Sequence, residues 1–163
     1  MEFRADNVDE AAHRTLAKAL FNFTWELIEK PDRSPDETDL MINAAHAGRF
    51  HWGLVGTPRN AALSEWQIAR VYALAGRGEA ALVHARKSLE LTVQHQLGDF
   101  ELGFAHEAMA RAYGVQARRG EQDVHLNQAR ACAARVAAED DRTWLLRNVE
   151  TVPSLTLPVW GSP

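Results

Sequence analysis

The residues best suited to bind a metal are histidines, of which the chain has seven. Asp39, Asn43 and His46 follow one another at four and three residues, so they share one face of a helix, and His51 follows near its end. Asparagine is a poor zinc ligand, and the sequence has neither an H-E-x-x-H motif nor a cysteine pair. We therefore expect the histidines to pack or to cap helices. The alternative is a helical-bundle metal-dependent enzyme or metal-binding protein that uses Asp39, His46 and His51.

An arginine that recurs in the pattern apolar-Ala-Arg-x-Tyr is the second candidate for chemistry. The pattern occurs as IARVY, with Arg70, and 41 residues later as MARAY, with Arg111. Two guanidinium groups about one repeat apart suit an acidic peptide or a C-terminal carboxylate, because guanidinium can bind carboxylate with two hydrogen bonds. In the structural alternative, Arg70 pairs with Glu107 on the neighbouring helix and Arg111 pairs with Glu107 one turn away.

Other residue types with catalytic potential lack the surroundings that catalysis requires. Ser64, Ser88 and Cys132 fall in helical segments without a neighbouring base or a nucleophile elbow. Asp140 and Asp141 lie at a polar junction where aspartate is favoured as a helix cap. The short GRG sequence lies between helices, so it forms a turn and not a phosphate loop. We expect a non-catalytic protein without a cofactor.

The composition indicates one soluble globular domain. The chain has 163 residues, of which 46% are hydrophobic and 25% are charged. A single cysteine cannot form an internal disulfide, and neither a signal peptide nor a membrane span is indicated. No basic stripe with interleaved aromatic residues suggests binding to nucleic acid. We therefore expect a cytoplasmic protein that binds neither nucleic acid nor membranes.

The net charge of −4 is concentrated at one end of the sequence. Residues 1–40 contain ten acidic and five basic residues, whereas the remainder contains twelve and thirteen. A solvated acidic helix pair explains this asymmetry. It is also compatible with a partner or with a second copy of the chain, as in a homodimer.

Caps and helix breakers divide the sequence into seven helices. Ser34 and Pro35 are typical of an N-cap and a first helical residue, as are Thr57 and Pro58, and Asp99 is a candidate cap for the fifth helix. The linking turns are short, so successive helices should be antiparallel in an all-α fold. The predicted helices cover about 8–30, 35–55, 58–75, 79–97, 99–118, 121–139 and 141–150.

After the last helix, three prolines indicate an extended tail. Its apolar residues should dock on the helices of the same chain or of a second copy, with Trp160 buried. These residues are Leu155, Leu157, Val159 and Trp160.

Residues 60–93 resemble a tetratricopeptide repeat (TPR), which has an apolar residue, a small residue and tyrosine on its first helix and small residues on its second. Val93 replaces the family's terminal proline. A looser second copy aligns Ala129 with Ala85 and Cys132 with Ser88 only if about three residues are inserted around RRGEQD. The matching residues are Ile68, Ala69, Tyr72, Ala81, Ala85 and Ser88, and in the second copy Met109, Ala110 and Tyr113.

The resemblance covers about two-thirds of the chain and implies a superhelix of about three antiparallel helix pairs. In a single domain of residues 1–163, we expect an N-terminal capping pair at 1–57, the best repeat at 58–98, a looser repeat at 99–138, and a capping helix with the tail at 139–163. A nonrepeating helical bundle is the structural alternative.

The family likeness also implies a scaffold that binds a protein or peptide in a concave groove lined by the first helices. Trp66 and the aromatic residues at 50–52 either pack in the core or form an aromatic wall for a partner. The stripe expected to face the groove consists of Leu63, Trp66, Arg70, Phe104, Glu107 and Arg111.

Overall fold

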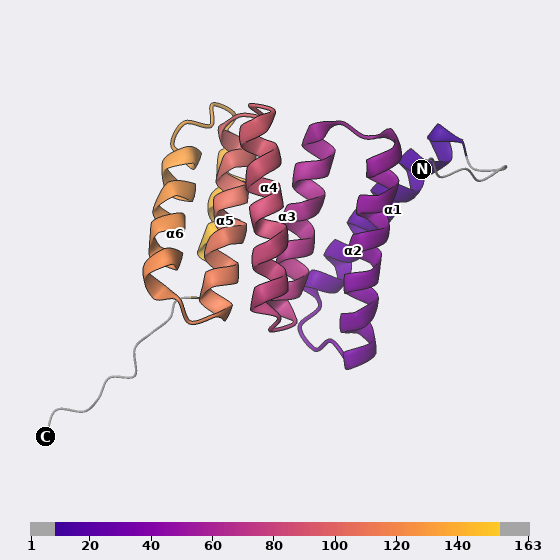
Figure 1. Ribbon diagram of the computed structural model, residues 1–163, viewed down its shortest axis with the longest axis horizontal. Coiled ribbons are helices and arrows are strands. Elements are labelled where there is room, and N and C mark those ends of the chain that lie inside the picture. Colours follow the sequence, from indigo (N-terminus) through magenta and orange to yellow (C-terminus); the bar gives the residue numbers. More distant parts are fainter. Residues whose placement is uncertain (1–8, 154–163) are drawn as a thin grey trace, which may run out of the picture.

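Seven α-helices follow one another in the computed structural model, which describes residues 9–153 (Figure 1). No strand occurs within this range. The helices pack in consecutive pairs, α1 with α2, α3 with α4 and α5 with α6, while α7 packs on α5 and α6. The all-α prediction is therefore confirmed. The helices are α1 (Glu10–Glu29), α2 (Pro35–Val55), α3 (Pro58–Leu74), α4 (Gly78–Gln94), α5 (Asp99–Val115), α6 (Arg119–Ala133) and α7 (Glu139–Glu150).

The predicted starts of α2 and α3 are confirmed. The Ser34 hydroxyl accepts a hydrogen bond from the Glu37 amide, and the Glu37 carboxylate accepts one from the Ser34 amide. This reciprocal capping box satisfies two amides that the helix itself leaves unpaired. Thr57 and Asn60 form the same arrangement at the start of α3. Local sequence thus fixes where both helices begin.

The prediction that Asp99 caps the fifth helix is wrong. Gly98 occupies the cap position with φ 107°, a backbone conformation that glycine adopts readily. Asp99 is the first residue of α5, and its carboxylate accepts hydrogen bonds from Arg135 in the segment between α6 and α7.

The pairs α3–α4 and α5–α6 repeat with an offset of 41 residues and no insertion. Both of the first helices have 17 residues, and the second helices start at Gly78 and Arg119. The turns also correspond, because Gly76 and Ala117 both have positive φ, 71° and 57°. The expected three-residue insertion around RRGEQD is therefore wrong.

Without that insertion, the buried positions of α4 and α6 correspond differently from the sequence alignment. Ala129 takes the place of Ser88, not of Ala85. Larger residues occupy two positions of the second copy where the first has alanine, so matching small residues misaligned the helices. One enlargement is compensated, because Gln122 packs against Gly114, where the first copy has Ala73. The buried pairs are Ala81 and Gln122, Ala85 and Leu126, Ser88 and Ala129, and Thr92 and Ala133.

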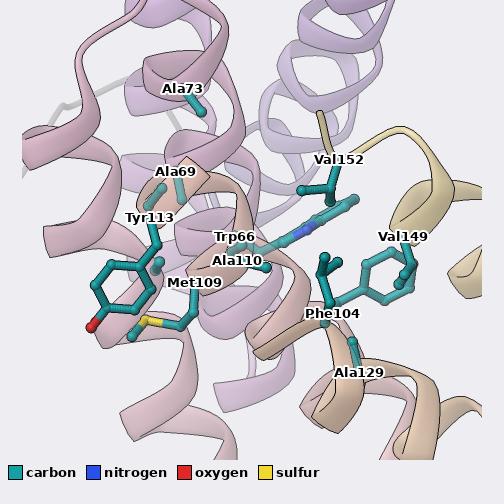
Figure 2. Close-up of a cluster of buried hydrophobic side chains, with 14 of the residues drawn as sticks. Trp66, Ala69, Ala73, Phe104, Met109, Ala110, Tyr113, Ala129, Val149 and Val152 are labelled. Carbon is teal, nitrogen blue, oxygen red and sulfur yellow. The ribbon is translucent and has the colours of Figure 1, made fainter. Parts of the chain in front are cut away.

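The larger hydrophobic cluster joins α3, α4, α5 and α6 to α7 (Figure 2). Trp66 and Phe104 are among the largest fully buried side chains. Leu145 of α7 is also fully buried, and it packs where α5 has Gly103. A smaller cluster at the junction of α1, α2 and α3 includes Met41. None of the described helices is long and apolar enough to cross a membrane.

Candidate functional site

A buried carboxylate, Glu107 of α5, lies at the centre of the face formed by α3, α5 and α7. Its side chain is fully buried. Trp66 Nε1 donates a hydrogen bond of 2.7 Å to Glu107 Oε2, and Arg111 Nε donates one of 2.7 Å to Oε1. Arg70 Nη1 lies 3.7 Å from Oε1. Both arginines therefore pair with Glu107, as the structural alternative expects.

The same two arginines hold the end of α7. Arg70 Nη1 donates to Asn148 Oδ1 at 2.6 Å. Arg111 donates to the backbone oxygens of Asn148 and Thr151 and to the Thr151 hydroxyl, at 3.1, 3.2 and 2.7 Å. Because the last carbonyls of a helix lack intrahelical partners, a buried guanidinium is well suited to bind them. The arginines thus position α7 over α3 and α5.

Arg70 is left with incomplete compensation of its charge. Burial and the positive charge of Arg111 lower the pKa of Arg70 to about 10, although Glu107 and Glu29 oppose this shift. Arg70 Nε is buried without a hydrogen-bond partner. The guanidinium lies 4.9 Å from the centre of the Trp25 ring, where it gains cation–π stabilisation. A further negative charge nearby would be stabilised.

The residues predicted to line the groove are brought together, but most are covered. Trp66, Arg70, Phe104 and Arg111 are buried together with Glu107. α7 covers them, because Leu145, Val149 and Val152 belong to the same hydrophobic cluster as Trp66 and Phe104. Most of the predicted stripe is therefore inaccessible from solvent.

Leu63 lies apart from the arginines and remains partly exposed. It lines a smaller depression of about 180 Å³ together with Phe21 of α1, Trp52 of α2 and two polar residues of α3. Trp52 thus joins the aromatic surroundings of Leu63, whereas Trp66 packs in the core.

An open pocket of about 370 Å³ lies between α1, α3 and the second half of α7. We call it the α1–α7 pocket. The Trp144 side chain is 40% exposed, and its ring centre is 6.3 Å from that of Trp25. Arg147 is exposed at the pocket and Arg70 forms part of its wall. The lining residues are Trp25, Ile28, Glu29, Arg70, Trp144, Arg147, Asn148 and Thr151.

Only Arg70 of this lining was predicted from the sequence. Trp25 and Trp144 give a signal that could have been noticed, because both are large aromatic residues in predicted helices. Their rings and that of Trp66 lie 5.6 to 6.3 Å apart across α1, α3 and α7. Sequence spacing could not bring together helices separated by more than 40 residues.

The residues considered for a metal site lie on α2 but have three different neighbours. Asp39 pairs with Arg77 at 3.6 Å. His46 Nε2 is 3.0 Å from the Tyr72 hydroxyl, and His51 Nδ1 is 2.7 Å from His13 Nδ1. Across residues 9–153, no three or more His, Cys, Asp or Glu residues form a group that could hold a metal ion. Burial lowers the pKa of His46 and of His51.

The hydroxyl and thiol groups considered as nucleophiles are engaged or buried. Ser64 donates to the Asn60 carbonyl at 2.7 Å, and Ser88 donates to the Ala62 carbonyl at 2.9 Å. Burial raises the pKa of Cys132, which disfavours the reactive thiolate. The two serines therefore form hydrogen bonds with backbone carbonyls, and Cys132 packs in the interior.

No protein-family model matches the chain, and no curated protein or solved structure matches it. The assignment of function therefore depends on the geometry of the chain itself. The α1–α7 pocket is the feature that combines an open volume, exposed aromatic surface and incompletely compensated positive charge.

Proposed function

We propose that this protein is a cytoplasmic, non-catalytic scaffold with TPR-like helix stacking, which binds a protein or peptide segment in the α1–α7 pocket. The observation that carries the proposal is the pocket itself, where two tryptophans flank a surface with excess positive charge. Tryptophan and arginine are the residue types most enriched where binding energy is concentrated. The proposed partner segment is acidic or ends in a carboxylate.

The 41-residue offset between α3–α4 and α5–α6 supports the TPR-like part of the proposal. Tyr72 and Tyr113 occupy equivalent positions in the two first helices, and each is preceded by alanine at the same distance. The offset exceeds the roughly 34 residues of a TPR unit because the helices are long. Stacked helix pairs of this kind offer extended surfaces for binding other chains.

The charges around the pocket favour an acidic ligand. Arg70 and Arg147 line it together with Glu29, and the pair of Arg111 and Glu107 lies beneath. These five side chains comprise three arginines and two glutamates, so their net charge is +1. Since a carboxylate forms strong hydrogen bonds with guanidinium, it would offset the charge repulsion between Arg70 and Arg111.

The test uses Arg147, because it is exposed at the pocket and replacing it leaves the buried arginines in place. An array of peptides with free or amidated C-termini, with and without acidic residues, is screened against the protein, and affinities are measured by fluorescence anisotropy. Arg147→Gln should weaken binding about tenfold, the loss expected for one charged hydrogen bond. Arg130→Gln, which changes an exposed arginine of α6 outside the pocket, is the matched control.

A preference for free over amidated C-termini would identify terminal recognition, whereas equal binding of internal acidic segments would identify acidic peptides in general. The proposal fails if no peptide binds, or if Arg147→Gln and Arg130→Gln bind equally well. Substituting Arg70 and Arg111 is a poorer test, because both are buried and hold α7.

Self-association stays a prediction. Leu16 and Phe23 of α1 are exposed at 43% and 36%, at the end of the stack formed by the acidic helix pair. Light scattering at high micromolar concentration and low salt should detect a homodimer. A monomer under these conditions would contradict the prediction.

A further inference from the structure

Each of the three helix pairs contains a close contact between titratable side chains to which the second helix contributes a histidine. His51 Nδ1 of α2 lies 2.7 Å from an imidazole of α1, and His84 Nδ1 of α4 lies 2.7 Å from Glu65 Oε2 of α3. In the last pair, His125 Nδ1 of α6 lies 3.0 Å from His106 Nδ1 of α5. Among these three histidine contacts, the one in α3–α4 is the one that includes a carboxylate.

The contacts in α3–α4 and α5–α6 occupy equivalent positions. Glu65 and His106 differ in number by 41, as do His84 and His125. A tyrosine stacks on the second-helix histidine in both, with ring centres 5.5 Å apart. The two joints therefore differ mainly in one residue, which is an acid in the first pair and a base in the second.

This difference reverses the response of the two joints to protons. A protonated His84 forms an ion pair with the Glu65 carboxylate, so acid preserves that contact. His106 and His125 can share one proton in a hydrogen bond, but two protonated rings present only donors to each other and repel. Burial and the charge of His125 lower the pKa of His106 to about 4, and burial also lowers the pKa of His125.

Within residues 9–153, no carboxylate forms a hydrogen bond or an ion pair with His106 or His125. On the same two helices, the titratable neighbour of this contact is Tyr113, whose ring also carries the Arg118 guanidinium at 4.7 Å. By contrast, Glu65 has both His84 and Arg49 within hydrogen-bonding distance.

We propose that the His106–His125 contact makes α5–α6 acid-sensitive, so that this pair opens in acid while the equivalent Glu65–His84 contact keeps α3–α4 closed. A histidine that resists protonation when folded stabilises the fold above the pKa of the unfolded chain. That stabilisation is lost as pH falls from about 6.5 toward 4. Because α7 packs on α5 and α6, opening also disrupts the α1–α7 pocket. This last consequence rests on the proposed binding function.

The test is amide hydrogen exchange of the full chain at pH 7 and pH 5, corrected for intrinsic exchange rates and read separately for α3–α4 and α5–α6. It needs no ligand, so its outcome is independent of whether the pocket binds peptides. The pKa change of His106 predicts an opening constant for α5–α6 that rises by up to about 20-fold, with little change in α3–α4.

His106→Glu, which copies the first joint, should remove the acid response of α5–α6. His125→Gln, which keeps a neutral hydrogen-bonding group, should reduce the acid response of α5–α6. It replaces the first variant in the test if His106→Glu does not fold. Glu90→Gln, which changes an acid of α4 that does not pair with either histidine contact, is the control and should keep the wild-type response. Equal pH dependence of the two helix pairs, or an unchanged acid response in a folded His106→Glu or His125→Gln protein, would overturn the proposal.

Discussion

The helix pairs α3–α4 and α5–α6 have the same backbone register but different side chains at the positions that matter for the site. Trp66 and Glu107 occupy equivalent positions of the two pairs, 41 residues apart. One is an aromatic hydrogen-bond donor and the other is a buried acceptor, and the two side chains form a hydrogen bond with each other. The repeated arginines, Arg70 and Arg111, then share that one acceptor. A repeated backbone therefore builds an asymmetric polar centre, because each pair supplies what its neighbour lacks.

A comparison of their outer surfaces gives the same lesson. The pair α5–α6 is followed by the single helix α7, whereas α3–α4 is followed by a complete pair. α5 carries Gly103 where Leu145 of α7 approaches closely. The position 41 residues earlier is Ala62, which is also buried but carries a methyl group. The differences between the copies are thus concentrated where tertiary contacts differ.

The largest expected effect comes from removing the shared acceptor. Glu107→Gln leaves two buried guanidinium groups with one uncharged partner and places an amide against the Trp66 donor. Breaking a buried ion pair on one side typically costs about 3–5 kcal/mol of unfolding free energy. Urea unfolding followed by circular dichroism measures the loss. The control is Glu121→Gln, whose partner Arg118 is exposed, and it should leave the urea midpoint nearly unchanged.

A midpoint for Glu107→Gln equal to that of Glu121→Gln would contradict the importance of the polar centre. That result would mean that apolar packing alone holds the two helix pairs together.

A smaller effect is expected from filling the space that accommodates α7. A Cβ atom at Gly103 would lie 2.4 Å from Leu145 Cδ2 and 3.3 Å from Cys132 Cβ. Overpacking of this kind costs about 1–3 kcal/mol, which outweighs the helix propensity that alanine gains in Gly103→Ala. Thermal unfolding should show a lower midpoint.

Gly120→Ala provides the matched control, since nothing lies within 4 Å of the added Cβ. It should have the same or a slightly higher melting temperature. If Gly103→Ala is as stable as Gly120→Ala, the close approach of α7 to α5 is not a tight constraint.

The smallest effects should come from exchanging the turn residues of the two pairs. Gly76→Ala places a side chain at φ 71°, whereas Ala117→Gly removes one at φ 57°. Left-handed backbone costs a non-glycine residue about 1 kcal/mol, so the first change should destabilise and the second should stabilise by similar amounts. Chemical denaturation of both variants checks the signs. Changes in the same direction would mean that the turns are not equivalent.

The positions of the helices could largely be predicted, and the functional surface only in part. The starts of α2 and α3 were correct because Ser34 and Thr57 act within three residues of themselves. The insertion in the second copy was wrong because Leu126 and Gln122 occupy positions where small residues were expected. Residue size at a helix contact depends on the facing helix, and Gly114 supplies the space that Gln122 fills.

For the polar centre, the sequence pointed to Arg70 and Arg111 and to Glu107 as the acid that pairs with them. It did not reveal that α7 covers this centre or that Asn148 and Thr151 complete it. The prediction that Trp160 of the tail is buried lies outside residues 9–153. Deleting residues 154–163 tests it and keeps Val152, which belongs to the core. Melting temperature and solution mass are the quantities to compare.

By itself, the sequence determined that seven helices follow one another, where α2 and α3 begin, and the recurrence of an arginine before each repeated tyrosine. These features depend on caps, helix breakers and three- to four-residue spacing, all of which act over a few residues. The end of α6 was predicted wrongly, because the helix expected to reach Glu139 ends at Ala133. Only the tertiary structure decided that Arg70 and Arg111 meet at one carboxylate, that α7 buries them, and that Trp25 and Trp144 border an open pocket. Those outcomes depend on the packing of helices that are distant in the chain. Several helices together determine the shape of the pocket and the surroundings of the buried charges.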